Sequence, residues 1–246
     1  MKIVIKLGSA VLVRDGLIDR RAMVSVAGQI DELMRQGHAV VLVSSGAVAS
    51  CPDERYSKSL RAAIGQPKLM RLYKDYFGIF GRETCQLFYT HEDLGGSRSV
   101  YTKKIVLEAI AQGIVPVINA NDSVNSKELD ALKEYADNDA LAARVATMIA
   151  ADRVYLLIGE QGLMDYDTGK VIHTVDSVKK AAQLARGKSA VGSGGMQSKL
   201  AVADMLRKKG IDVWLLPGKE PAAIIDSMKG EKIGTGFLAK KKTRLR

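Results

Sequence analysis

Apolar residues follow two alternating patterns along this chain. Runs of about five mainly apolar residues predict buried β-strands, and longer stretches with apolar residues at helical spacing predict amphipathic helices. Because the strands alternate with helices, the pattern predicts an α/β fold with a parallel sheet that helices cover on both faces. The predicted strands are Lys2–Leu7, Ala39–Val43, Thr84–Tyr89, Ile114–Ile118, Val154–Ile158 and Asp212–Leu216. The predicted helices are Arg21–Arg35, Ser59–Phe80, Tyr101–Gln112, Asp139–Ala150, Met196–Lys209 and Pro221–Met228, the last with its proline in the first turn.

The last predicted element is a closing turn at Gly234–Phe237 that leads into an edge strand. No internal repeat or low-complexity linker interrupts the pattern, so we expect one domain over residues 1–237 and a basic tail over residues 238–246. The net charge is +10, and five of the last seven residues are Lys or Arg. No aromatic residue interleaves with these charges and no nucleic-acid recognition motif precedes them. We therefore expect a solvated tail and no nucleic acid as a partner.

Composition narrows the class of protein. Hydrophobic residues make up 47% of the 246 residues and charged residues 26%, which is typical of a globular chain and excludes a disordered or fibrous one. The longest apolar runs fall far short of the roughly 20 residues that span a bilayer, and no signal-peptide pattern opens the chain. We expect a cytoplasmic protein that is not bound to a membrane.

The two cysteines and three histidines are scattered along the chain. Cys51 and Cys85 form no Cys-x-x-Cys pair, and His38, His91 and His173 lie in unrelated segments. The sequence therefore predicts free thiols and no metal site built from these side chains.

Candidate chemistry lies in the loops that follow the strands, because ligands of open parallel sheets bind beyond the carboxyl ends of the strands. Lys6 and Gly8 close the first strand, where an ammonium and nearby backbone N–H groups could meet a phosphate. Ser44–Ala47 ends the next strand and could bind an anion at a helix start. A surface lysine and an ordinary helix cap are the alternative interpretations.

Two clusters of acidic and amide residues flank a single loop. Asn119–Asp122 follows the strand at Ile114, and Asp137–Asp139 precedes the next helix. Carboxylates accept hydrogen bonds from an ammonium or from the waters of a magnesium ion, and amides donate to a carboxylate. The clusters therefore predict a site for a small polar ligand, with simple turns as the alternative.

A glycine-rich segment at Gly192–Lys199 runs into a helix. Such a loop suits a phosphate, and Lys199 lies one turn into the helix. The segment lacks the Walker pattern and the third glycine of a dinucleotide fingerprint, and a flexible hinge is the alternative.

Taken together, these segments resemble the amino acid kinase family, and within it the branch that phosphorylates glutamate. The resemblance extends from Lys2 to about Phe237, so we expect a short form without the C-terminal PUA domain found in many members. It rests on Val4–Ser9, Val43–Ala49, Ala63–Met70, Val115–Asp122, Asp137–Asp139, Gly194–Lys199 and Gly234–Gly236.

The resemblance implies a three-layer αβα sandwich and a homo-oligomer that uses ATP and Mg²⁺. The implied reaction moves the γ-phosphoryl group of ATP to the side-chain carboxylate of L-glutamate, the first step of proline biosynthesis. The implied catalytic residues are Lys6, Asp139 and Lys199, with Asp139 ordering the two lysines. The implied glutamate-binding residues are Ser45, Asp122, Asp137 and Asn138, and the implied nucleotide-binding residues are Lys6, Gly8, Ser193, Gly194, Gly195, Met196, Gln197, Ser198 and Lys199.

The residue inventory agrees with this reaction. A carboxylate nucleophile is already ionised at neutral pH, so the reaction needs no general base, and histidines are not expected in the motifs. What the reaction needs is positive charge around the transferred phosphoryl group, which lysines, loop amides and magnesium supply.

Three segments depart from the family pattern. Ile158–Gly159 stands where a Thr-Asp pair is usual, the loop before Asp137 is long and charged, and Tyr101–Lys104 replaces an Asn-Ala-Arg segment. Two alternatives therefore stay open. One is a related kinase that acts on another small acid or phosphate, and the other is a non-catalytic sensor of a nucleotide or an amino acid.

Overall fold

Seven strands form one sheet in the computed structural model, which describes residues 1–90, 92–123, 138–184 and 195–239. The strand order is β5-β6-β4-β1-β7-β8-β9, and every neighbouring pair is parallel except β8 with β9. The strands are β1 (Lys2–Leu7), β4 (Ala39–Ser44), β5 (Thr84–Tyr89), β6 (Val115–Ala120), β7 (Arg153–Ile158), β8 (Asp212–Pro217) and β9 (Thr235–Phe237).

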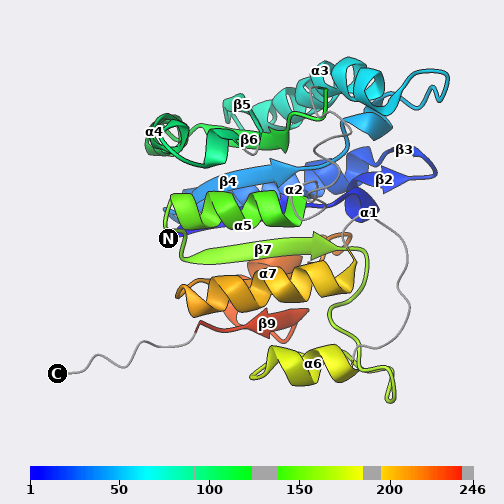
Figure 1. The fold of residues 1–246 in the computed structure, drawn as a ribbon, viewed down its shortest axis with the longest axis vertical. Helices are drawn as coiled ribbons and strands as arrows, with labels where there is room; N and C mark the ends of the chain where they lie inside the picture. Colours follow the sequence, from blue (N-terminus) through cyan, green and yellow to red (C-terminus); the bar gives the residue numbers. More distant parts are fainter. Residues whose placement is uncertain (91, 124–137, 185–194, 240–246) are drawn as a thin grey trace.

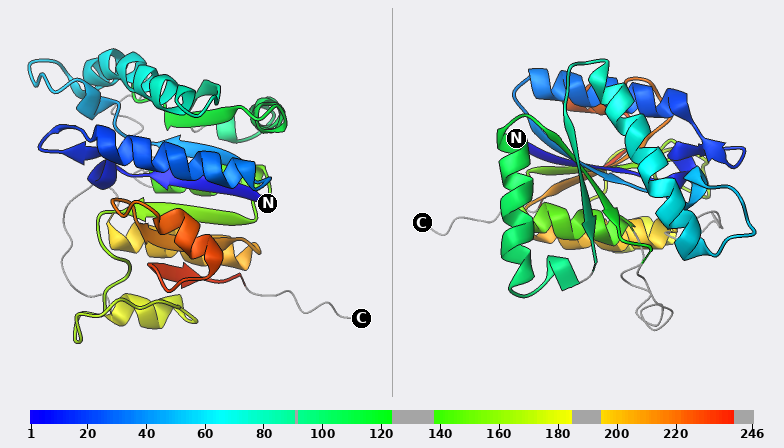
Figure 2. Two further views of the ribbon diagram at one scale, coloured as in Figure 1. Left: turned by 180° about the vertical axis from the view of Figure 1, so that it is seen from behind. Right: turned by 90° about the horizontal axis from the view of Figure 1, so that it is seen from above.

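Helices cover both faces of this sheet, which makes the fold a three-layer αβα sandwich (Figure 1). One face carries α4 (Arg98–Ala111), α5 (Asn138–Met148) and α7 (Met196–Lys208), with α6 (Val178–Leu184) beside α7. The other face carries α2 (Arg20–Arg35), α3 (Lys58–Gly78) and α8 (Ala223–Lys229), seen from behind in Figure 2. Because both faces are covered, the central strands are buried along nearly their whole length.

Local chemistry sets the ends of several helices. The Asp19 side chain accepts hydrogen bonds from the backbone N–H groups of Arg21 and Ala22 and so starts α2. Ser57 caps α3 in the same way, and α8 ends at Gly230, whose φ of 87° is readily adopted only by glycine.

The six predicted strands, the predicted edge strand and the six predicted helices are confirmed, with shifts of up to three residues at their ends. One detail is wrong: Pro221 precedes α8 and its N-cap Ala222, so the proline is not in the first turn. The pattern also missed α1 (Ser9–Leu12), α6, and the short hairpin of β2 (Val13–Arg14) and β3 (Leu17–Ile18). None of the helices in the described ranges is long and apolar enough to cross a membrane.

Candidate active site

The candidate site lies where the carboxyl ends of β1, β4, β6 and β7 meet the first turn of α5. α5 packs against all four strands and against α7 (Figure 1). β1 lies in the middle of the sheet, with β4 on one side and β7 on the other. The strands that follow β1 in the chain are therefore added on both sides of it. Ligands of open α/β sheets bind at such a switch point, beyond the carboxyl ends.

A buried carboxylate joins two lysines at this edge. Asp139 Oδ1 lies 2.6 Å from Lys6 Nζ, and Asp139 Oδ2 lies 3.0 Å from Lys199 Nζ. Asp139 is completely buried, and the two lysine side chains are only 8% and 13% exposed. The cluster has two positive charges and one negative charge, so it retains a net positive charge that favours an anionic ligand.

Two glycines shape the surroundings of these lysines. A Cβ at Gly8 would lie only 3.1 Å from Lys6 Nζ, so glycine leaves the room that the ammonium occupies. Gly195 is the N-cap of α7, and its carbonyl accepts hydrogen bonds from Ser198 N and Lys199 N. Lys199 therefore lies in the first turn of α7, where backbone N–H groups add to its positive charge.

Asn138 and Ser45 form a second pair beside Asp139. Asn138 Nδ2 donates hydrogen bonds to Ser45 Oγ at 2.8 Å and to the carbonyl oxygen of Ser44 at 3.4 Å. Behind them, the hydroxyls of Ser44 and Tyr73 are 2.6 Å apart, and Ser44 Oγ donates to the carbonyl oxygen of Ser45. Burial raises the pKa of Tyr73, so its hydroxyl stays protonated and can donate. Tyr73 was not among the predicted site residues.

Asp122 lies apart from that pair, in the lining of a cavity of about 420 Å³ beside the carboxyl ends of β5 and β6. Burial raises the pKa of Asp122, and the nearby charge of Lys58 acts in the opposite direction. Neither Ser45 nor Asn138 lines this cavity. The structure thus brings Lys6, Asp139 and Lys199 into contact and Ser45 into contact with Asn138, while Asp122 belongs to a neighbouring hollow.

Gln66 lines the same cavity and was also not among the predicted site residues. Its position depends on Gly65, because a Cβ there would lie 1.8 Å from the carbonyl oxygen of Ala47. Glycine therefore lets α3 approach the loop after β4 closely enough to bring Gln66 to the cavity. The sequence contains the signal, since a glycine in a helix interior marks a close approach.

Three predicted site residues, Asp137, Ser193 and Gly194, lie outside the described residues. Met196, Gln197 and Ser198 open α7, as expected for a loop that runs into a helix. His, Cys, Asp and Glu side chains form no group of three or more that could hold a metal ion in the part of the chain that the structure describes. Both thiols are free: Cys51 is buried and Cys85 is half-buried.

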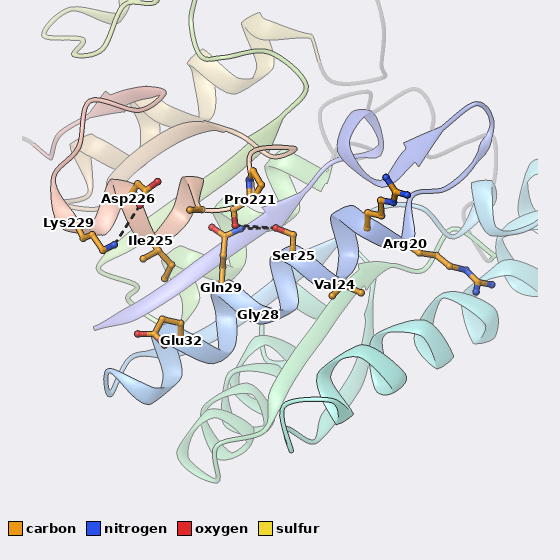
Figure 3. A pocket seen from close by; sticks show the side chains of 12 residues that line it. Arg20, Val24, Ser25, Gly28, Gln29, Glu32, Pro221, Ile225, Asp226 and Lys229 are labelled. Atoms are coloured by element: carbon orange, nitrogen blue, oxygen red, sulfur yellow. Dashed lines mark hydrogen bonds and ion pairs between the residues drawn. The ribbon is translucent and has the colours of Figure 1, made fainter.

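A larger hollow of about 700 Å³ lies between α2 and α8 (Figure 3). Ser25 Oγ donates to the carbonyl oxygen of Pro221, and Gln29 Oε1 accepts from Ile224 N, so the two helices are joined across it. Its lining contains none of the predicted site residues.

The fold and the candidate site agree with the protein family that sequence comparison identifies. The model of the amino acid kinase family matches residues 1–216, and the chain belongs to that family. Among curated relatives, the chain is similar to the glutamate 5-kinase of Thermus thermophilus, with 37% identity over 258 aligned positions, which cover 99% of this chain and 69% of the relative. The glutamate 5-kinase of Vibrio parahaemolyticus is also 37% identical, over 96% of this chain and 66% of the relative. That of Shewanella amazonensis is 37% identical over 97% of this chain and 66% of the relative.

Proposed function

We propose that this protein transfers the γ-phosphoryl group of ATP to the side-chain carboxylate of L-glutamate and forms glutamyl 5-phosphate, the first step of proline biosynthesis. The observation that carries the proposal is the cluster in which Asp139 holds Lys6 and Lys199 at the switch point of the sheet. The relatives named glutamate 5-kinase, aligned over nearly the whole chain, support glutamate as the acceptor.

The proposed chemistry needs positive charge and alignment rather than a base. A carboxylate oxygen of glutamate forms a bond to the γ-phosphorus while the bond to the β-phosphate oxygen breaks, and ADP leaves. The ammonium groups of Lys6 and Lys199 would bind phosphoryl oxygens on which negative charge redistributes in the transition state. Asp139 would be the residue that fixes the positions of the two ammonium groups before the substrates bind.

The remaining predicted residues are assigned by position. Ser45 and Asn138 lie beside Asp139 and would face the reacting side-chain carboxylate, and Asp122 would accept hydrogen bonds from the α-ammonium group. Gly8 and the start of α7, from Gly195 to Lys199, would surround the nucleotide phosphates. Asp137 stays a predicted glutamate-binding residue, and Ser193 and Gly194 stay predicted nucleotide-binding residues.

Magnesium fits this arrangement as a companion of the nucleotide. Both oxygens of Asp139 bond to ammonium groups, so the residues present suit a nucleotide that brings Mg²⁺ on its own phosphates. When bound there, the ion supplies further positive charge to the transferring group. The resemblance also supports a homo-oligomer in the cytoplasm. Light scattering on the purified protein would test the oligomeric state.

The test is an acceptor screen. The purified protein is incubated with ATP, Mg²⁺ and a panel of amino acids and small acids, and the acyl phosphate is trapped as a hydroxamate. We expect a hydroxamate with glutamate and much less with aspartate or N-acetylglutamate. Preference for another acid would favour a related kinase of this fold, and an absence of ATP turnover with every acceptor would favour the sensor.

A further inference from the structure

The cavity that contains Asp122 is lined by two residues whose side-chain donors no described residue satisfies. It lies between the first half of α3 and the carboxyl ends of β5 and β6. Two glutamines line it, Gln66 from α3 and Gln86 from β5, and Asp122 follows β6. The Nε2 atoms of both glutamines are buried and have no hydrogen-bond partner among the residues that the structure describes.

The orientation of the Gln66 amide is fixed by its neighbour. Asn119 Oδ1 accepts a hydrogen bond from the backbone N–H of Ala120, so Asn119 Nδ2 is the atom that donates to Gln66 Oε1, at 3.0 Å. The Nε2 group of Gln66 is then the end left without a protein partner. Gln66 is only 5% exposed and Asn119 1%, so bulk water does not take that place freely. An unsatisfied buried donor destabilises the protein, and a bound acceptor would recover that free energy.

Gln86 supplies a second donor from a different element. Gln86 and Phe88 are two positions apart on β5, so both side chains lie on the same side of the strand, and both line the cavity. Phe88 contributes an apolar wall, as do Ala62 and Ala63 of α3. Two amide donors and one carboxylate therefore share one hollow, whose other walls are apolar except for Asn121 and Ser123 beside Asp122. The Ser123 hydroxyl donates to Asn121 Oδ1.

We infer that Gln66 and Gln86 bind the α-carboxylate of the acceptor, while Asp122 binds its α-ammonium group, so that this cavity selects a free α-amino acid. The inference rests on the proposed function and adds specificity-determining residues to it. Donors match a carboxylate and a carboxylate matches an ammonium, which is the charge pattern of a zwitterion. The reacting side-chain carboxylate of the same molecule would then extend toward Ser45, which is joined to the cavity lining through the adjacent Gly46 and Ala47.

Asn138 is a less suitable donor for the α-carboxylate. Its Nδ2 group already donates to Ser45 Oγ and to the carbonyl oxygen of Ser44, and it lies outside the cavity lining. The Nε2 groups of Gln66 and Gln86 have no such competing partners among the described residues.

The test compares three ligands that differ in one group. Glutamate has both α-groups, 4-aminobutyrate lacks the α-carboxylate, and glutarate lacks the α-ammonium group. Dissociation constants are measured by calorimetry for the wild-type protein, Gln66→Glu and Gln86→Met. Gln66→Glu keeps the oxygen that accepts from Asn119 and replaces the donor by an acceptor, and Gln86→Met removes the second donor in the less buried position.

We expect each variant to bind glutamate and glutarate about 10- to 100-fold more weakly, the usual loss for a hydrogen bond to a charged group. The affinity for 4-aminobutyrate should stay the same or increase, so the preference for glutamate over 4-aminobutyrate falls by the same factor. The matched control is Gln29→Glu, another buried glutamine whose Oε1 accepts a backbone hydrogen bond, and it should change none of these affinities.

The inference is wrong if the preference for glutamate over 4-aminobutyrate is unchanged in both variants, or if glutarate binding is unaffected. The proposed function is judged separately, by hydroxamate formation with the wild-type protein. A wild-type protein that phosphorylates glutamate while both variants keep their ligand preference would overturn the inference alone. A wild-type protein that binds glutamate without phosphorylating it would overturn the proposed function. The ligand preferences of the two variants would still decide the inference.

Discussion

The two ends of the proposed site are built in opposite ways. At the phosphate end, Asp139 holds Lys6 and Lys199, so the charges are paired before any substrate arrives. At the acceptor end, Gln66 and Gln86 keep buried donors without protein partners. Charges fixed in advance stabilise a transition state, whereas donors that only a ligand can satisfy discriminate between ligands. Substitutions at the first end should therefore lower kcat, and substitutions at the second should raise KM for glutamate.

The largest effect is expected for Asp139→Asn. The amide cannot balance two ammonium groups, so Lys6 and Lys199 would repel each other and leave the positions in which they face phosphate. We expect kcat to fall by about 10³-fold or more, with KM for glutamate changed only a few-fold. Steady-state kinetics with saturating ATP measures both.

Asp31→Asn is the matched control for that substitution. Asp31 is also a buried carboxylate that bonds two cations, Arg35 at 2.7 Å and Arg82 at 2.8 Å, but it lies on α2 away from the site. Its loss should lower the melting temperature and leave kcat nearly unchanged. A kcat within tenfold of wild type for Asp139→Asn, or equal losses in both variants, would contradict the distinction between the two carboxylates.

Removal of either lysine is the next largest change. Lys6→Ala and Lys199→Ala should each lower kcat by about 10²- to 10³-fold, because each removes a contact that strengthens in the transition state. Glutamate binding should weaken far less. Lys2→Ala serves as the control, since Lys2 lies on the same strand as Lys6 and its ammonium donates to the carbonyl oxygen of Ile149 at the opposite edge of the sheet. Near-normal turnover in a lysine variant would remove that lysine from the mechanism.

The same contrast separates what the sequence could predict from what it could not. Lys6, Asp139 and Lys199 each stand at the end of a strand or the start of a helix, so the parallel fold alone brings their segments to one edge. Gln66 and Tyr73 lie inside α3, at the spacing of the buried Leu69 and Phe77. Periodicity assigns such positions to the core and contains no information on which amide lacks a partner.

The missed hairpin had a readable signal. Asp15 and Gly16 both have positive φ, 52° and 75°, as in the Asp-Gly turns that join two short strands. The strands have only two residues each, too few for an alternating pattern to stand out. Local turn chemistry is therefore more informative at this position than hydrophobic periodicity.

Asp122→Asn tests the acceptor end. Loss of a charge-assisted contact should raise KM for glutamate by about 10- to 100-fold and leave KM for ATP nearly unchanged. Because burial raises the pKa of Asp122, the wild-type carboxyl takes up a proton at a higher pH than an ordinary aspartate does. KM for glutamate should therefore rise as the pH falls toward that range, and Asp122→Asn should lack this dependence.

Stability provides the control for Asp122. A raised pKa means that the folded protein disfavours the charged form, so a neutral asparagine should not lower the melting temperature at neutral pH. If Asp122 only tied down the loop that follows it, the variant would melt earlier and both Michaelis constants would rise alike.

The smallest expected effect is that of Tyr73→Phe, which tests whether the acceptor end depends on a hydrogen bond beneath it. Tyr73 does not reach either substrate directly in this scheme; its hydroxyl bonds Ser44 Oγ, and Ser44 in turn donates to the carbonyl oxygen of Ser45. The ring is fully buried, so phenylalanine keeps the packing and removes one hydrogen bond worth about 1 kcal/mol. We expect a two- to fivefold rise in KM for glutamate, with KM for ATP unchanged.

Tyr155→Phe is the matched control, since its ring is equally buried and its hydroxyl accepts from Arg153 on β7. Both variants should lose similar stability, and only Tyr73→Phe should change glutamate binding. Equal kinetics in the two variants would mean that Ser45 is positioned by Asn138 and the backbone alone.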